Sequence, residues 1–184
     1  MARAIANLRR ARVLAPAALA ALPTRRLARL IRSTGYYRTK APRVKVFLRF
    51  LRTRYGFNLS RMLAQRISIL RQELLALSGI EPETADSIFL YAGHVPTIVV
   101  DAYTRRILAR HGLIDPDAIS DAAQALFMQN LFPDVRLYNE SHALLVAIGK
   151  DSCRAVPRCA GCPLRRDPER HRPVHARRFL GLFP

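Results

Sequence analysis

Apolar residues recur at helical spacing along much of this chain. The clearest stripe repeats at i, i+3, i+4, i+7 and i+11, with basic residues between its members; it consists of Val44, Phe47, Leu48, Leu51 and Tyr55. This pattern predicts an amphipathic helix with an arginine-rich outer face. Pro42 is expected in its first turn, where proline is tolerated.

Further helical segments follow, and no convincing alternation of the kind that strands show is present. A second stripe, closed by Gly93, comprises Ala85, Ile88, Phe89 and Ala92. More helices are predicted at 102–111, 117–130 and 135–149. The one apolar extended run, 97–100, is too short and isolated to build a sheet. The pattern therefore predicts an all-α protein.

Composition narrows the class of protein. Half of the 184 residues are hydrophobic, which supplies a core and excludes disorder for most of the chain. No run of 18 uncharged apolar residues exists, so no membrane-spanning segment is expected. Three cysteines, an odd number, argue against a secreted disulfide scaffold.

Charge is distributed in blocks. The net charge is +18, and 28 of the 31 basic residues are arginines. Residues 1–72 hold 18 basic residues and no acidic one, whereas 73–151 hold 5 basic and 11 acidic residues. So large a positive charge indicates a polyanionic partner, most often nucleic acid. A solvated basic face without a partner is the alternative.

The N-terminal region has a second interpretation. Residues 1–32 are rich in arginine and alanine and lack acids, which is the composition of an organellar transit peptide. The acid-free composition continues to residue 72, far beyond a presequence. A cytoplasmic, nucleoid-associated protein is therefore expected.

A short turn joins two of the predicted helices. Residues 79–82 read Gly-Ile-Glu-Pro, with Pro82 in a first-turn position and Thr84 opening the next helix. Such a hairpin presents backbone N–H groups and the positive end of a helix, which together bind a DNA phosphate without reading sequence. The expected DNA contacts are Gly79, Ile80, Glu81 and Thr84.

These residues belong to a longer pattern. It runs L-x-G-I-x-x-E-T-A-D from Leu77 and then V-V-D-A-Y-T-R-R from Val99. Three further groups of residues belong to the same pattern: Gly35-Tyr36-Tyr37, Tyr138-Asn139-Glu140 with His142-Ala143, and Gly149-Lys150 with Cys153. The combination resembles the helix-hairpin-helix (HhH-GPD) DNA glycosylases, in the endonuclease III-like branch that includes 3-methyladenine DNA glycosylases. The resemblance covers roughly residues 3–165.

The resemblance implies a two-lobed helical fold. Residues 1–95 would form an incomplete six-helix barrel with the helix-hairpin-helix at about 68–93. Residues 96–184 would form a C-terminal helical domain with a cysteine-rich loop, 153–162, and a basic tail. A monomer would bind double-stranded DNA across a cleft, with the damaged nucleotide flipped into a pocket, because the glycosidic bond is unreachable inside the stack.

The resemblance also implies a catalytic carboxylate at Asp101. Its charge would stabilise the oxocarbenium character of the sugar and position water. The alternative is an ordinary helix N-cap, a position that aspartate favours.

The expected reaction is hydrolysis of the N-glycosidic bond of a damaged, alkylated base. Bifunctional members of the family carry a lysine at the position of Glu83, where the amine forms a Schiff base with the sugar. Glutamate cannot do so, and it otherwise suits the first turn of a helix. The sequence therefore predicts a monofunctional glycosylase; the alternatives are an endonuclease III-like glycosylase with AP lyase activity and a non-catalytic DNA-binding remnant.

Two departures from the family pattern favour the last alternative, a non-catalytic DNA-binding remnant. Glu81 stands where the hairpin usually has a second glycine, and a side chain there hinders close approach of a phosphate. The chain also begins later than the family does, as if the N-terminus were truncated or its start codon misassigned.

The cysteines form a third departure. Cys153, Cys159 and Cys162 are spaced as in the family's [4Fe–4S] loop, but the fourth cysteine is missing. His171 or His175 could complete a set for iron–sulfur or zinc; the favoured interpretation is a loop without a metal and a protein without another cofactor. His142 is expected to be an ordinary core histidine.

Overall fold

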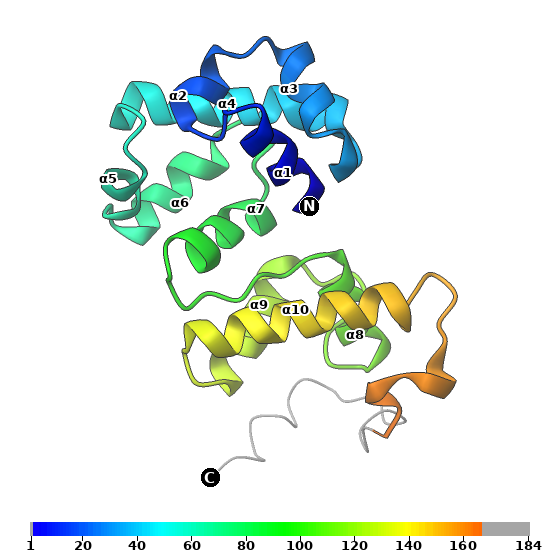
Figure 1. Ribbon diagram of the computed structural model, residues 1–184. Helices are drawn as coiled ribbons and strands as arrows, with labels where there is room; N and C mark the ends of the chain where they lie inside the picture. The colour runs from blue at the N-terminus through cyan, green and yellow to red at the C-terminus, as the bar shows by residue number, and fades with distance from the viewer. Residues whose placement is uncertain (1, 167–184) are drawn as a thin grey trace. The chain divides into compact units, whose positions relative to one another are not determined.

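The computed structural model describes residues 2–166 (Figure 1). No β-strand occurs in that range, and the run 97–100 is extended coil, so the all-α class is confirmed. The elements are α1 (Ala2–Arg10), α2 (Pro16–Ala21), α3 (Thr24–Leu30), η1 (Arg32–Thr34), α4 (Tyr37–Tyr55), α5 (Leu59–Leu63), α6 (Ile67–Leu75), α7 (Pro82–Ser87), η2 (Ile88–Ala92), α8 (Ala102–Arg110), α9 (Ser120–Asn130), α10 (Val135–Asp151), η3 (Cys159–Gly161) and η4 (Pro163–Arg166).

Two compact units divide the chain, Met1–Glu81 and Pro82–Pro184. Within the described residues, no helix has both the length and the apolar composition needed to cross a membrane. The assignment of residues 1–95 to a six-helix barrel stays a prediction.

The first unit has its core among α1, α3 and α4. The buried side chains there are Ala4, Leu8, Leu22, Leu27, Ile31 and Ala41. Further along α4, the predicted stripe is buried at Leu48, Leu51 and Tyr55. The helix therefore turns its apolar side inward and leaves most of its arginines in water, as the periodicity predicts.

The start of α4 differs from the expectation. The helix begins at Tyr37, five residues before Pro42, so the prediction that Pro42 stands in the first turn is wrong. Tyr36 precedes the helix in the left-handed conformation, with φ of 47°. Pro42 lacks the N–H that would donate to the carbonyl of Arg38, and that one bond is missing from an otherwise continuous helix.

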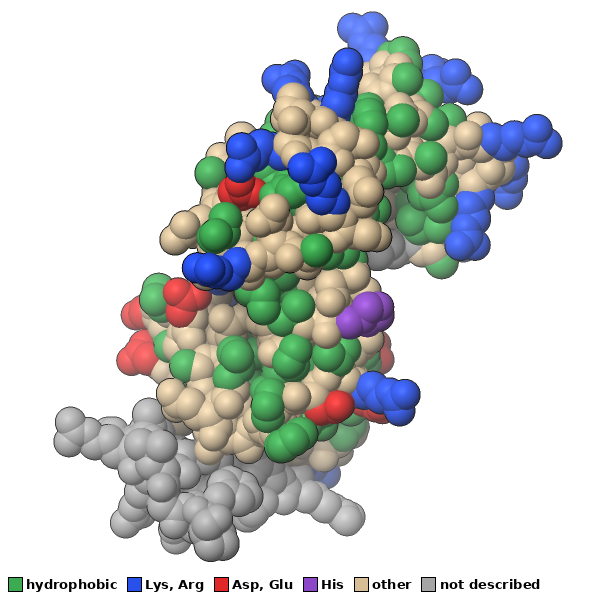
Figure 2. All heavy atoms as spheres, turned by 90° about the vertical axis from the view of Figure 1, so that its left-hand side faces the viewer, with side chains coloured by type: hydrophobic (Ala, Val, Ile, Leu, Met, Phe, Trp, Pro, Cys, Tyr) green, Lys and Arg blue, Asp and Glu red, His purple; other side chains and the backbone are tan. Residues whose placement is uncertain are grey.

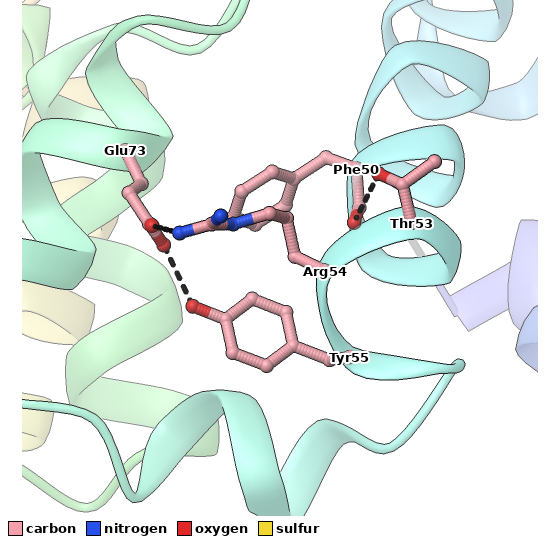
Figure 3. A network of polar contacts seen from close by, with 5 residues as sticks. All are labelled: Phe50, Thr53, Arg54, Tyr55 and Glu73. Carbon is pink, nitrogen blue, oxygen red and sulfur yellow. Dashed lines mark hydrogen bonds and ion pairs between the residues drawn. The ribbon is translucent and has the colours of Figure 1, made fainter.

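A polar network ties α4 to α6 (Figure 3). The buried Tyr55 hydroxyl donates to Glu73 Oε2 at 2.6 Å, and the exposed Arg54 pairs with the other carboxylate oxygen. The hydrogen bond from Tyr55 is the largest effect and lowers the pKa of Glu73; burial opposes it, and the pairing with Arg54 lowers the pKa further. The single acidic residue of α6 thus anchors two helices of the basic unit.

The second unit begins with an irregular helix. The stripe from Ala85 to Ala92 predicts one regular helix, but the α-helix ends at Ser87 and continues as a π-helical turn, η2. A π-turn inserts one extra residue and shifts the direction in which later side chains project. The wider turn therefore decides where Tyr91 points.

The core of the second unit lies between η2, the run 97–100 and helices α8 to α10. Its buried members are Leu90, Ile98, Val99, Val100, Leu108, Ala123 and Tyr138. Helices α8 and α10 lie side by side and run in the same direction, since Asp101 meets His142 and Arg106 meets Gly149. A Cβ added to Gly149 would stand 2.5 Å from Cδ1 of Tyr103, so glycine permits this close approach.

We predict that Glu73→Ala lowers the free energy of unfolding by about 1–3 kcal/mol, because it leaves the Tyr55 hydroxyl buried without its acceptor. Chemical denaturation of the variant and of Gln72→Ala, at an exposed site on the same helix, measures the difference. Equal losses in both variants would contradict the role of the network.

The same interaction predicts a pH dependence. The pKa of Glu73 in the folded chain lies below its unfolded value. The stabilisation is therefore fully present above the unfolded pKa and is lost as pH falls through the folded pKa. The difference in stability between wild type and Glu73→Gln should shrink through that acidic window.

We predict that Gly149→Ala costs about 1–3 kcal/mol, because the methyl group must displace the Tyr103 ring and with it α8. Gly161→Ala is the control, since nothing lies within 4 Å of the Cβ it would introduce. Thermal unfolding of both variants tests this, and a Gly149→Ala protein as stable as the control would refute the close packing.

Candidate active site

Asp101 stands at the N-terminus of α8, directly after the buried residues Val99 and Val100. Its Oδ1 accepts a hydrogen bond from the backbone N–H of Thr104 at 2.7 Å, so the residue is the N-cap of the helix. The residue is only 8% exposed. The capping interpretation is therefore correct for one carboxylate oxygen, and Oδ2 takes no part in the cap.

Gln124 of α9 fixes the segment that leads to Asp101. Its Nε2 lies 2.9 Å from the carbonyl of Ile98 and 3.3 Å from Oγ1 of Thr97. The same nitrogen is 3.0 Å from Oδ2 of Asp86, a carboxylate that is itself 5% exposed. One amide thus joins α7, the extended run and α9. The sequence analysis missed both Asp86 and Gln124, since their pairing spans 38 residues.

His142 lies beside the free oxygen of Asp101. Its Nε2 is 3.7 Å from Oδ2, and its Nδ1 contacts the hydroxyl of Tyr91. The side chain of His142 is 14% exposed, as the sequence predicts for a core histidine, and its ring meets a carboxylate and a phenol. His142 and Gly149 are seven residues apart and share one face of α10, and the structure shows that α8 packs against this face.

The surroundings set the charge of the carboxyl group. Burial by itself raises the pKa of Asp101, but the adjacent His142 imidazole and the hydrogen bond from Thr104 outweigh it and leave the pKa below the usual value. Burial, with a smaller contribution from Asp101, raises the pKa of Tyr91. The site therefore holds an ionised carboxylate next to a neutral phenol.

The hairpin residues occupy the junction between α6 and α7. Gly79 has φ of +87°, and a Cβ there would stand 2.5 Å from Cγ of Arg43, so this turn requires glycine. Ile80 is buried and its N–H donates to the carbonyl of Leu77 at 3.0 Å, whereas Glu81 is exposed. Thr84 lies exposed in α7, which begins at Pro82.

The cysteine loop is tied to α8 by two arginines. Arg106 donates to the carbonyls of Cys153 and Gly149, and Arg110 donates to those of Arg154 and Ala155. Arg110 also lies 3.4 Å from the sulfur of Cys153. These contacts hold the start of the loop through backbone carbonyls.

All three cysteines line one cavity of about 330 Å³, together with His111 and Arg110. Across residues 2–166, however, no three His, Cys, Asp or Glu side chains come together as a metal site. The guanidinium of Arg110 lies against the Cys153 sulfur, and a cation there does not suit a metal ligand, so the described residues do not fit the iron–sulfur cluster. His171 and His175, the expected extra ligands, lie outside the described residues.

Charge on the surface follows the blocks in the sequence. On the face in Figure 2, Lys and Arg side chains gather over the first unit, and most of the acidic side chains lie over the second. Lys40 and Lys45 are bound to backbone carbonyls, of Thr34 and Leu19 respectively, at 2.9 and 3.2 Å. The outward positive charge of the first unit comes mainly from arginine.

Comparisons with known proteins place this arrangement in a family. Residues 1–133 match the family model of the HhH-GPD superfamily base excision DNA repair protein. A protein of Methanocaldococcus jannaschii assigned as a DNA repair glycosylase, MJ1434, is 39% identical over 165 residues, which cover 89% of this chain and 74% of the relative. Endonuclease III of Bacillus subtilis is 30% identical over 78% of this chain and 62% of its own length.

Solved structures agree in fold. A non-covalent complex of endonuclease III with DNA superimposes with a TM-score of 0.65 at 27% identity, covering 83% of this chain and 67% of that protein. The 3-methyladenine DNA glycosylase MagIII of H. pylori, bound to 1,N6-ethenoadenine, gives a TM-score of 0.68 at 23% identity, covering 80% and 75%. The chain therefore belongs to the HhH-GPD superfamily of base excision DNA repair proteins and is a DNA glycosylase of that superfamily.

Proposed function

We propose that the chain is a monofunctional DNA glycosylase in which the Asp101 carboxylate stabilises the sugar cation formed as a damaged base leaves. The observation that carries this proposal is that the two oxygens of the Asp101 carboxyl group have different contacts. Oδ1 caps α8, while Oδ2 remains outside the cap and the pKa of the group lies below its usual value. A carboxylate kept ionised in a largely buried site acts strongly on a developing positive charge.

At the sugar, the reaction requires little from the protein besides this carboxylate. As the glycosidic bond breaks, positive charge develops at the anomeric carbon, and a fixed negative charge nearby lowers the barrier. Water, oriented by Asp101, then adds to that carbon and gives its proton to the Asp101 carboxylate. Alkylated purines suit such a site because the alkyl group already places positive charge on the base, which therefore leaves neutral without a proton from the enzyme.

The absence of a lyase step is supported by the hairpin sequence and by two of the lysines. Glu83 carries no amine, and the chain has only three lysines. Lys40 and Lys45 donate to carbonyls at helix ends in the first unit, where they serve as caps. Lys150 stands exposed near the end of α10, two turns beyond His142.

Double-stranded DNA with a flipped nucleotide is the proposed substrate form. The acid-free residues 1–72 supply positive charge that releases counterions from the phosphates. The turn at Gly79 offers a backbone that a phosphate can approach, although Glu81 beside it weakens that contact. The arginines of the first unit would then supply most of the affinity, and the carboxylate in the second unit would act on the sugar.

We predict that Asp101→Asn abolishes excision while preserving the fold. Asparagine caps a helix nearly as well as aspartate, so the melting temperature should change little. Excision of alkylated purines from methylated duplex DNA should fall by roughly 100-fold or more, because the charge that stabilises the cation is gone. Single-turnover release of the base measures the rate.

Asp101→Ala separates the two roles of this residue. It should lose excision and also about 1 kcal/mol of stability, since the cap is removed as well. A stable Asp101→Asn protein that releases bases at the wild-type rate would refute the catalytic assignment.

We also predict that borohydride does not trap this protein on DNA containing an abasic site, because no lysine occupies the position of Glu83. Glu83→Lys is the matched variant that restores an amine at that position, and gel mobility shows any adduct. A covalent adduct of the wild-type protein that maps to residues 74–106 would favour the alternative, a glycosylase with AP lyase activity.

A further inference from the structure

Three polar side chains from three separate segments meet at the N-terminus of α8. Asp101 belongs to the cap of α8, His142 lies in the middle of α10, and Tyr91 comes from the π-helical turn η2. The tyrosine and histidine rings lie with centroids 6.1 Å apart. The side chains of Asp101 and His142 are only 10% and 14% exposed. Partly buried polar groups of this kind need defined partners.

The contacts determine where the imidazole carries its proton. Tyr91 meets Nδ1, and Oδ2 of Asp101 lies 3.7 Å from Nε2. In a neutral ring, a phenol that donates to Nδ1 leaves the proton on Nε2, facing the carboxylate. In a charged ring both nitrogens are protonated, and Nε2 again presents N–H to Asp101. The remaining arrangement, a neutral ring with its proton on Nδ1, would point a lone pair of Nε2 at a carboxylate, which is repulsive.

We propose that His142 is a positioning residue for Asp101, and that Tyr91 orients the imidazole so that Nε2–H always faces the carboxylate. This proposal rests on the proposed function of Asp101. The cap holds Oδ1 through Thr104, which fixes the rotamer, and the imidazole lies 3.7 Å from Oδ2, where its N–H favours the ionised state. Oδ2 can accept more than one hydrogen bond, so the contact leaves it able to face the sugar and a water.

Burial makes such support necessary. Desolvation favours the neutral form of a buried carboxyl group, and donors to the charged form must outweigh it. The titratable groups that face Asp101 are His142 from α10 and Tyr91 from η2, and its own helix contributes Thr104. The Thr104 side chain also favours the ionised form, but among the groups from other elements only the imidazole can present an N–H to Oδ2. Its loss should let burial dominate.

Two substitutions of His142 by amide side chains of similar polarity test this arrangement. His142→Gln places an amide N–H at about the reach of Nε2, whereas His142→Asn places it at about the reach of Nδ1. Tyr91→Phe removes the phenol and leaves the ring free to adopt either tautomer. Leu144→Ala, at a residue of the same helix that is 56% exposed, is the control for general effects on α10.

The primary measurement is the pKa of Asp101 by carbon-detected NMR titration of the full chain. It should rise in His142→Asn, stay near the wild-type value in His142→Gln and Leu144→Ala, and rise less in Tyr91→Phe. The second measurement is the pH dependence of single-turnover excision. The acidic limb should move to higher pH in His142→Asn, and the rate should fall by roughly 10- to 100-fold through loss of alignment, with His142→Gln restoring both.

The outcomes separate this proposal from the proposed function. An unchanged pKa of Asp101 in a folded His142→Asn protein would overturn the role of His142, whatever the activity. The expected pKa changes in a protein that excises no base would uphold the positioning role and refute the catalytic role of Asp101. If His142→Asn does not fold, the other two variants provide the test. A pKa of Asp101 that rises in His142→Gln and stays unchanged in Tyr91→Phe would then overturn the proposal.

Discussion

The close parallel packing of α8 and α10 is the contact on which the candidate active site depends. Gly149 allows it, because any side chain at that position would strike the ring of Tyr103. Arg106 then reaches the carbonyl of Gly149 and stacks on Tyr103 at 5.2 Å. Fixed in this way, the two helices bring their matching turns together: Asp101 meets His142 at one end, and Arg110 meets the cysteine loop at the other.

One carboxylate consequently serves both stability and the proposed chemistry. As an N-cap, Asp101 satisfies a backbone donor that would otherwise be buried without a partner. As a charge, it costs desolvation free energy that the hydrogen bond from Thr104 and the adjacent His142 imidazole offset. A helix start is a suitable place for such a group, because the positive end of the helix favours the ionised form.

The cysteine loop is held to α8 by contacts within the protein. Guanidinium groups of α8 bind four backbone carbonyls of the end of α10 and the loop. Charge-assisted hydrogen bonds of this kind are among the stronger polar contacts in proteins. They stabilise the same segment that a cluster would otherwise order, and the three thiols remain around a cavity.

The sequence by itself determined the helical class, the apolar side of α4, the short turn at residues 79–82 and the place of Asp101 at the start of a helix. Each of these follows from local periodicity, backbone conformation or capping, which neighbouring residues decide. The start of α4 and the π-turn at Tyr91 escaped prediction, because tertiary packing overrode the local signals of Pro42 and of a regular stripe. The setting of His142, and the Gln124–Asp86 contact, depended on tertiary structure alone. They join residues 41 and 38 positions apart, and only the packing of α8, α9 and α10 against one core decides which side chains meet there.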